Sequence, residues 1–341
     1  MAALVEFTPN GLYCPAADIY IDPWNPVDKA VITHAHADHA RWGHKYYLAH
    51  QDSESILRYR LGGDIRVETL SYNEAIHIGG VKLSMYPAGH IIGSAQIRLE
   101  YRGEVWVVSG DYKLDDDGFC PPFEAVKCNT FITESTFGLP VYRWKSQNEV
   151  IKEVQNWWKK NQQDSKASLL SAYSLGKAQR LMTNIDLSNG PVYLHGAIYN
   201  TNEVLRKSGQ PLPYCPKLTT NVSKEDIQRA LVIAPPSAAQ SSWAKTLRSH
   251  NNGIVSGWMA IRGMKRRRAA DRGFIMSDHA DWQGLNQAVD ATEAERIYVT
   301  HGYTSVFSRW LQEQGYEAYE VETLYEGENA ENNPGSQNEE D

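Results

Sequence analysis

The stretch Ala30-Val31-Ile32-Thr33-His34-Ala35-His36-Ala37-Asp38-His39 places three imidazoles and one carboxylate within six residues, directly after a short apolar run. The apolar run predicts a buried strand, and the polar residues predict a loop of metal ligands after it. His34 and His36 point the same way where the chain stays extended, because side chains alternate along a strand. Asp38 and His39 follow a turn and can face a second position. The loop can therefore serve two metal ions, and its imidazole and carboxylate ligands suit zinc, manganese or iron.

The main alternative for this stretch is a histidine-rich surface loop that binds no metal. A lone His-x-His pair is a weak signal, whereas His-x-His-x-Asp-His after an apolar strand is a specific one. We therefore expect a metal site that is completed by ligands from other parts of the chain.

The composition is that of a globular protein. Its 341 residues suffice for about two domains, and 42% of them are hydrophobic. No apolar run approaches the roughly 18 residues of a membrane span, and the first residues lack the pattern of a signal peptide. The four cysteines are scattered and form no Cys-x-x-Cys pair, so we expect free thiols in a reducing cytoplasm.

The net charge of −7 is unevenly distributed along the chain. Residues 326–341 include six acidic residues and no basic one, so the rest of the chain carries a net charge of −1. This tail contains Pro and Gly and has no apolar periodicity, which predicts disorder. The basic cluster Arg262-Gly263-Met264-Lys265-Arg266-Arg267-Arg268 has the opposite sign. The total charge is therefore a poor guide to partners.

Basic residues at two places are candidates for contacts with a nucleic-acid backbone. Lys265, Arg266, Arg267 and Arg268 belong to the basic cluster, and their positive charge suits phosphates. A solvated surface is the alternative, because charge runs usually lie on one. Lys177 begins an expected helix after a strand and can meet a phosphate there, with a solvated helix lysine as its alternative.

Polar residues of the ligand type recur where expected strands end. Five residues occupy such positions: Asp22, His34, His90, Asp111 and Glu134. One such case means little, but five predict a site along one edge of β-sheets. Asp22 can orient a ligand histidine through a hydrogen bond, although a turn-forming aspartate before proline is an equally good interpretation of that position.

From residue 146 onward, expected helices alternate with short apolar strands. Helical spacing covers 147–161, 174–185 and 237–248, and apolar strands fall at 168–172, 231–234 and 253–257. This alternation predicts parallel βαβ units in a separate α/β domain. After the basic cluster, strands followed by ligand-type residues return with His279 and His301. The α/β domain is therefore expected to be an insertion.

These residues resemble the signature of the metallo-β-lactamase superfamily, and in particular of its β-CASP nuclease branch. The superfamily pattern matches Asp22, His34, His36, Asp38, His39, His90 and Asp111, and the branch pattern matches Glu134, His279 and His301. The match covers nearly all of residues 15–325. More narrowly, Ser174-Leu175-Gly176-Lys177-Ala178-Gln179-Arg180 and the stretch 258–268 are similar to bacterial DNA-ligase-associated exonucleases.

The resemblance implies an α/β fold, a metallo-β-lactamase αββα sandwich with an inserted α/β domain that is named β-CASP. We expect the first part of the metallo-β-lactamase domain at 1–145 and the inserted β-CASP domain at 146–268. The second part of the metallo-β-lactamase domain is then expected at 269–325, and a disordered acidic tail at 326–341.

The resemblance also implies two divalent metal ions, with zinc, manganese and iron as candidates. The implied ligands are His34, His36 and His90 for one ion and Asp38, His39 and His301 for the other, with Asp111 bridging the two. We interpret Asp38, His279 and Glu134 as catalytic residues. His279 would contact the phosphate or protonate the leaving oxygen. Glu134 would orient His279 and favour its imidazolium form.

For function, the resemblance predicts a nuclease, with a 5′-to-3′ DNA exonuclease of DNA repair as the leading hypothesis. RNA processing is the alternative, because RNA-processing members carry a histidine at the position of His301 and interstrand-crosslink-repair members tend to lack it. A thioesterase or lactonase shares the histidine motif, but the insertion and the basic cluster argue against it. A non-catalytic scaffold would not need every ligand. Expected partners are DNA or RNA as substrate and a DNA ligase or helicase, in the cytoplasm.

Overall fold

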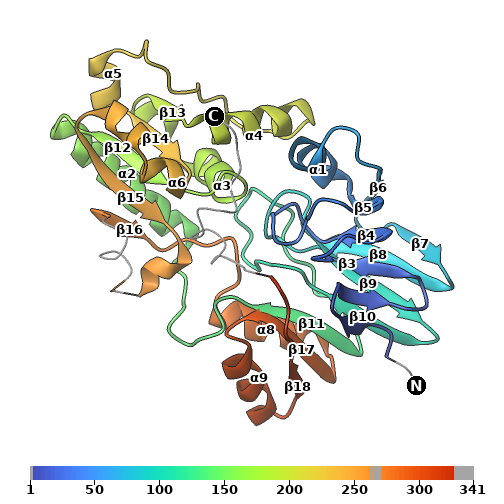
Figure 1. The fold of residues 1–341 in the computed structure, drawn as a ribbon. Coiled ribbons are helices and arrows are strands. Elements are labelled where there is room, and N and C mark those ends of the chain that lie inside the picture. Colours follow the sequence, from blue (N-terminus) through green and yellow to red (C-terminus); the bar gives the residue numbers. More distant parts are fainter. Residues whose placement is uncertain (1–2, 262, 264–269, 326–341) are drawn as a thin grey trace. The chain divides into compact units, whose positions relative to one another are not determined.

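A computed structural model of the chain describes residues 3–261, 263 and 270–325 (Figure 1). Its internal contacts divide these residues into two compact units. Unit 1 consists of 3–140 and 278–325, and unit 2 consists of the described residues of 141–277. Unit 2 therefore begins five residues before the expected insertion 146–268 and ends nine residues after it. The expected tail and the candidates Lys265, Arg266, Arg267 and Arg268 lie outside the described residues.

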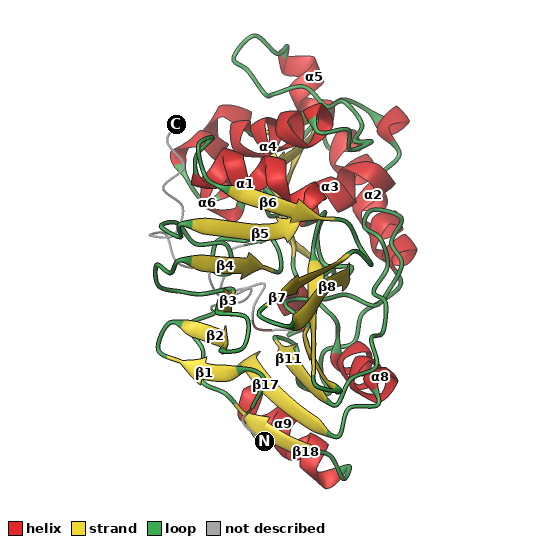
Figure 2. Cartoon of the chain, turned by 90° about the vertical axis from the view of Figure 1, so that its right-hand side faces the viewer, coloured by secondary structure: helices red, strands yellow, loops and turns green. Residues whose placement is uncertain are grey.

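Sheet A of unit 1 has six strands in the order of the sequence, which lie side by side in Figure 2. They are β1 (Glu6–Thr8), β2 (Gly11–Cys14), β3 (Ile19–Ile21), β4 (Lys29–Ile32), β5 (Tyr46–His50) and β6 (Val67–Leu70). The first three strands pair antiparallel, and β3 to β6 are parallel. The parallel strands therefore end at one common edge.

Sheet B of unit 1 has seven strands in the order β18-β17-β11-β10-β9-β8-β7. They are β7 (Ala75–Ile78), β8 (Val81–Pro87), β9 (Ala95–Tyr101), β10 (Glu104–Val108), β11 (Thr130–Ser135), β17 (Arg296–Gly302) and β18 (Glu317–Glu320). The strands β10, β11, β17 and β18 are parallel, and β8 shares their direction because it pairs antiparallel with β9, which pairs antiparallel with β10. Residues before and after the insertion thus belong to one sheet.

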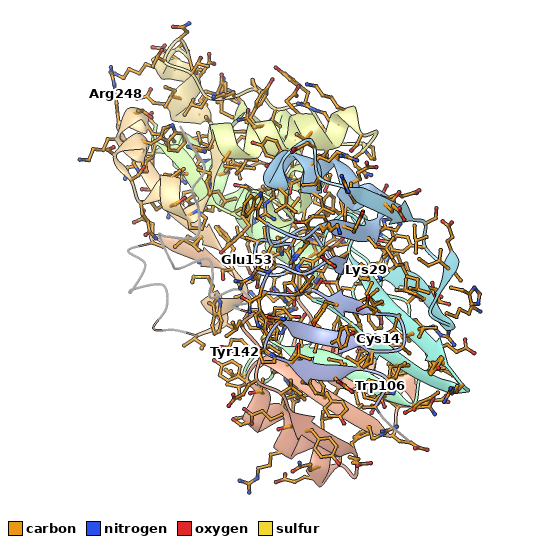
Figure 3. All side chains as sticks on the ribbon, turned by 45° about the vertical axis from the view of Figure 1, so that its right-hand side comes forward. Cys14, Lys29, Trp106, Tyr142, Glu153 and Arg248 are labelled. Atoms are coloured by element: carbon orange, nitrogen blue, oxygen red, sulfur yellow. The ribbon has the colours of Figure 1, made fainter. Side chains whose placement is uncertain are left out.

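Two hydrophobic clusters among the described residues hold unit 1 together. One contains side chains of both sheets, among them Ile21 and Val31 of sheet A and Ile97 of sheet B. Cys14 and Trp106, which Figure 3 labels, belong to the same core. The other cluster joins sheet B to the helices α8 (Trp282–Thr292) and α9 (Thr304–Glu313). The helix α1 (Glu54–Leu61) follows β5. Burial of these apolar faces fixes the strands whose ends carry the polar residues.

Unit 2 is built around sheet C, whose five strands are all parallel in the order β13-β14-β12-β15-β16. Its elements are α2 (Gln147–Gln163), β12 (Ala167–Ser171), α3 (Lys177–Asn184), β13 (Val192–Leu194), α4 (Gly196–Lys207), α5 (Lys224–Arg229), β14 (Leu231–Ala234), α6 (Pro236–Ala239), β15 (His250–Val255) and β16 (Arg272–Phe274). Leu170 and its neighbour Leu169 belong to different hydrophobic clusters, so both faces of the sheet are covered. The expected parallel βαβ units are confirmed.

The expected helix over 237–248 is wrong in one respect. The chain forms only the short helix α6 there, followed by a 3-10 turn at Ser242–Leu247. Between them, the hydroxyl of Ser241 accepts a hydrogen bond from Trp243 N at 3.1 Å. Serine side chains compete in this way with the hydrogen bonds of a continuous helix.

Among the described residues, no helix combines the length and the apolar character that crossing a membrane requires.

Candidate metal centre

The ligand-type residues of unit 1 gather where strands of both sheets end. Asp22 follows β3, the loop with His34 follows β4, and Asp111 follows β10. His301 lies near the end of β17, next to β11. The end of β10 approaches the loop closely because Gly110 has a positive φ of 57° and no side chain. A Cβ atom at that position would lie 2.6 Å from Thr33 Oγ1. The fold therefore brings strand ends from distant parts of the sequence to one place.

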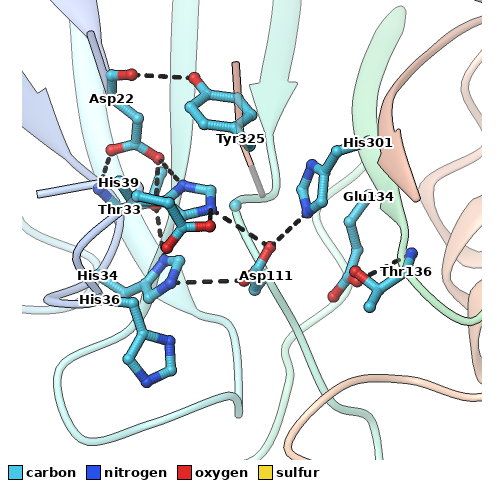
Figure 4. A network of polar contacts seen from close by, with 12 residues as sticks. Asp22, Thr33, His34, His36, His39, Asp111, Glu134, Thr136, His301 and Tyr325 are labelled. Atoms are coloured by element: carbon cyan, nitrogen blue, oxygen red, sulfur yellow. Dashed lines mark hydrogen bonds and ion pairs between the residues drawn. The ribbon is translucent and has the colours of Figure 1, made fainter. Parts of the chain in front are cut away.

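The imidazoles of His34, His39 and His301 point at the carboxylate of Asp111 (Figure 4), and His90 lies near the same carboxylate. The Nε2 atoms of His34 and His90 lie 3.5 Å and 3.7 Å from Asp111 Oδ2. The Nε2 atoms of His39 and His301 lie 3.6 Å and 2.9 Å from Asp111 Oδ1. We call the group around Oδ2, with His34, His36 and His90, the first half-site. The group around Oδ1, with Asp38, His39 and His301, is the second half-site. Each oxygen of one carboxylate thus faces its own pair of imidazoles.

Threonine hydroxyls fix the tautomer of one histidine in each half-site. Thr33 Oγ1 donates to Asp22 at 2.5 Å, so its lone pair accepts from His34 Nδ1 at 3.0 Å. Thr300 Oγ1 donates to a main-chain carbonyl at 3.1 Å and accepts from His301 Nδ1 at 3.0 Å. With the proton on Nδ1, a neutral imidazole presents an Nε2 lone pair to Asp111.

The other two imidazoles around Asp111 are oriented in the same way. His39 Nδ1 donates to Asp22 Oδ2 at 2.8 Å, and His90 Nδ1 donates to the carbonyl of Asp278 at 2.9 Å. His34 Nε2 and His39 Nε2 are buried and have no hydrogen-bond partner. Hydrogen bonds that fix the distal nitrogen are the usual support of metal-binding histidines. The buried lone pair of the neutral His34, which faces a carboxylate, fits a cation.

The pKa shifts agree with this interpretation. Burial, and next the charge of His39, hold the pKa of His34 well below its usual value, so it is neutral. Burial raises the pKa of Asp111, but neighbouring histidines, His39 first, outweigh burial and hold it well below its usual value. Burial lowers the pKa of His39, but Asp111, Asp38 and Asp22 outweigh burial and raise it to about 10. The second half-site therefore retains a proton where a metal ion would supply positive charge.

The remaining two expected ligands lie at the rim of the site. His36 Nδ1 is 3.0 Å from His90 Nε2, and the potential ligand atoms of His34, His36, His90 and Asp111 all lie within 4.8 Å of one another. Asp38 Oδ2 is 3.7 Å from His39 Nε2. Both side chains are half-buried, whereas the other expected ligands are buried. The structure therefore brings all seven expected ligands together.

Glu134 and His279 form a buried pair beside the first half-site. His279 Nδ1 donates to Glu134 Oε2 at 2.9 Å and lies 3.9 Å from Asp111 Oδ2. Glu134 Oε1 accepts the main-chain N–H of Tyr112 at 2.8 Å. The carboxylate is thereby fixed between two donors and in turn holds the imidazole. This arrangement orients the imidazole of His279.

Lys177 is the one expected nucleic-acid contact among the described residues. It begins helix α3 in unit 2, where its side chain is buried and its Nζ lies 4.9 Å from the ring centre of Tyr173. The alternative of a solvated helix lysine is therefore wrong.

Two features of the site are absent from the sequence expectations. The ring of Tyr325 stacks on that of His39, with centroids 4.5 Å apart and an interplanar angle of 10°. The two threonines that fix tautomers each precede a histidine, in Thr33-His34 and Thr300-His301. The repeated Thr-His dipeptide was a signal available in the sequence. Tyr325 had no such signal, because its partner lies far away in the chain.

Comparison with known proteins finds relatives whose names refer to DNA ligation or RNA processing. The chain is 29% identical over 320 residues to a probable DNA ligase of Opitutus terrae. This alignment covers 93% of this chain and 31% of that protein. It is 23% identical over 378 residues to endoribonuclease YSH1 of Mycosarcoma maydis, covering 84% and 42%. It is 22% identical over 297 residues to cleavage and polyadenylation specificity factor 73 of Drosophila melanogaster, covering 72% and 43%. The chain thus spans less than half the length of these relatives.

A solved structure shares the fold. A protein of unknown function from Enterococcus faecalis superposes with a TM-score of 0.55 at 12% identity, covering 86% of this chain and 78% of that one. No protein-family model matches the chain. The signature residues, their assembly around Asp111 and the curated relatives together support the β-CASP branch of the metallo-β-lactamase superfamily as the family that this chain resembles.

Proposed function

We propose that unit 1 binds two divalent metal ions, zinc, manganese or iron, and that the protein is a metal-dependent nuclease. The observation that carries this proposal is the arrangement at Asp111, where two imidazoles face each carboxylate oxygen. His34, His36 and His90 would hold one ion, and Asp38, His39 and His301 the other, with Asp111 between them. When bound, two such ions supply Lewis acidity toward a water molecule and a phosphoryl oxygen.

The protein's own contribution to the reaction would come from the buried pair of Glu134 and His279. Glu134 accepts the Nδ1 proton of His279 and holds the ring in one orientation. His279 Nε2 can then contact the scissile phosphate and donate a proton to the leaving oxygen. Asp38, at the rim of the second half-site, completes the residues to which we assign catalysis. Asp22 would keep His39 and the loop residue Thr33 in place.

We further propose that the fold is the αββα sandwich of the superfamily. The shared core between sheets A and B and the packing of α8 and α9 on sheet B support it. Unit 2 would be the inserted β-CASP domain, at 146–268, between metallo-β-lactamase parts at 1–145 and 269–325. The acidic segment 326–341 would follow as a disordered tail.

For the substrate, we propose DNA, as a single strand or an end, with digestion from 5′ to 3′ in DNA repair. The relative named probable DNA ligase supports this choice, because it matches 93% of this chain within 31% of its own length. Because the matching region is part of a longer protein named as a DNA ligase, this protein would act together with a DNA ligase or a helicase. The cluster Lys265 to Arg268 would contact the nucleic-acid backbone. The four free cysteines suit the cytoplasm.

RNA is the second candidate substrate. Two relatives carry names of RNA-processing proteins, an endoribonuclease and a cleavage and polyadenylation factor. His301, which the RNA-processing members of the branch share, is present and lies 2.9 Å from Asp111.

The test uses single-stranded DNA and RNA of one sequence, labelled at the 5′ or the 3′ end, with zinc, manganese or iron added to metal-free protein. We expect metal-dependent shortening of DNA from its 5′ end and none with His36→Ala. Degradation of RNA with DNA spared would replace DNA by RNA as the substrate. A metal-loaded protein that cleaves neither would contradict the nuclease proposal.

A further inference from the structure

A short segment after the last strand of sheet B connects the two elements of the second half-site. This segment, 321–325, is called the strap. Its first part is tied to β17, the strand of His301: Val321 N donates to the carbonyl of Val299 at 2.9 Å, and Thr323 Oγ1 donates to that of Thr300 at 2.6 Å. Two hydrogen bonds from a side chain and the main chain thus fix where the strap leaves the sheet.

The far part of the strap is tied to the metal loop. Arg41 donates to the carbonyl of Leu324 at 3.1 Å and to that of Asp38 at 3.3 Å. The hydroxyl of Tyr325 donates to the carbonyl of Asp22 at 3.1 Å. The strap therefore links β17, which carries His301, to the loop that carries Asp38 and His39.

The ring of Tyr325 covers His39. Besides the parallel stack on His39, it meets His301 edge-on, with centroids 5.6 Å apart at 75°. Trp24 also packs edge-on against the tyrosine, with centroids 5.5 Å apart at 79°. Because aromatic contacts of this kind favour particular ring angles, they restrict rotation of the His39 imidazole. The hydrogen bond to Asp22 fixes the same ring at Nδ1.

Tyr325 also borders open space. A cavity of about 900 Å³ is lined by Tyr325, His301 and Trp24, among others. His39 itself is only 1% exposed. Loss of the tyrosine ring would open His39 to water from this cavity, and water competes with the hydrogen bonds that orient a buried imidazole.

We infer that Tyr325 is a positioning residue for the second half-site, where its ring holds the His39 imidazole toward Asp111 and His301. The inference rests on the proposed function, because it assigns His39 to a metal ion. Tyr325 acts on the half-site through its ring contacts with His39 and His301. None of the strap contacts described above is made with His34, His36 or His90, so the two half-sites should respond differently.

The test is a titration of metal-free protein with cobalt(II), followed by the visible absorption of the bound ion and by calorimetry. For the wild type we expect two bound ions. Tyr325→Leu should weaken one of them about 10- to 100-fold, the usual effect of losing a partner that orients a ligand, and should leave the other unchanged. Tyr325→Phe keeps the ring and should bind both ions nearly as the wild type does. Tyr319→Leu, at an exposed position of β18, is the matched control.

Unfolding of each metal-free variant, followed by circular dichroism, keeps the inference testable if Tyr325→Leu is unstable. In that case Thr323→Val, which removes one anchor of the strap and spares the ring, should weaken the same ion by a smaller factor. Two ions bound with wild-type affinity by folded Tyr325→Leu would overturn the inference, and so would equal losses in Tyr325→Leu and Tyr325→Phe. A wild-type protein that binds no metal would overturn the proposed function as well, which distinguishes the two failures.

Discussion

The two half-sites share Asp111 but are held in place by different kinds of partner. In the first half-site, the imidazoles are oriented by Thr33, the immediate neighbour of a ligand, and by a main-chain carbonyl. In the second half-site, they are oriented by Asp22, Thr300 and the ring of Tyr325. The difference teaches that a ligand cluster of nearly uniform composition can be oriented by a hydroxyl and a main-chain carbonyl on one side, and by a hydroxyl, a carboxylate and an aromatic ring on the other.

The largest expected effect removes what the half-sites share. Asp111→Asn keeps the shape of the side chain but removes its charge, so neither ion should bind well. Nuclease activity should fall by at least about a thousandfold. Bound metal ions lower the activation barrier by several kcal/mol, and each 1.36 kcal/mol of barrier is a factor of ten in rate. Metal content and the cleavage rate of labelled DNA measure this. The control is Asp115→Asn, on an exposed side chain. Two ions retained by Asp111→Asn would contradict the shared carboxylate.

Single-ligand substitutions should break one half-site at a time. His90→Ala should leave one ion, in the second half-site, and His301→Ala should leave one ion, in the first. The affinity for the lost ion should fall more than about 100-fold, beyond the effect of an orienting partner. Elemental analysis and cobalt absorption identify which ion remains. If either variant lost both ions, the half-sites would be one cooperative site.

A smaller effect comes from the two threonines that fix tautomers. Valine has nearly the same shape as threonine. Thr33→Val and Thr300→Val therefore each remove the oxygen that accepts an Nδ1 hydrogen bond with little change of shape. We expect a loss of about tenfold in affinity, at the low end of the effect of such partners, for the first ion in one variant and for the second in the other. Calorimetric titration measures both affinities. Equal effects of both variants on both ions would show that the orienting bonds are not separable.

The smallest effect tests a buried histidine outside both half-sites. Burial lowers the pKa of His44 to about 4. Below the unfolded pKa near 6.5, the unfolded chain binds a proton that the folded protein excludes, so stability falls as the pH drops from 6.5 toward 4. Between pH 7 and 5 this amounts to roughly 1–2 kcal/mol. His44→Gln should lose that part of the pH dependence in urea unfolding while keeping both ions. An unchanged pH dependence would assign the acid sensitivity to other groups.

The pattern of strands was predictable where the signal was local. Apolar runs that end in a polar residue placed Asp22, His90 and Asp111 at strand ends, and the structure has them there. The helix expected over 237–248 failed because Ser241 bonds to the main chain and ends the helical run. Local hydrogen bonding of a single side chain decided that segment, and periodicity does not report it.

The sequence by itself determined that ligand-type residues follow the ends of strands, and its resemblance to the superfamily implied which of them meet at one site. Only the tertiary structure decided how they divide between the two oxygens of Asp111 and which nitrogen of each imidazole faces inward. It also decided that Tyr325 covers His39, a contact that spans almost the whole chain. The physical reason is that ring contacts and tautomers depend on hydrogen bonds and packing between residues far apart in sequence, which exist only after the strands have assembled.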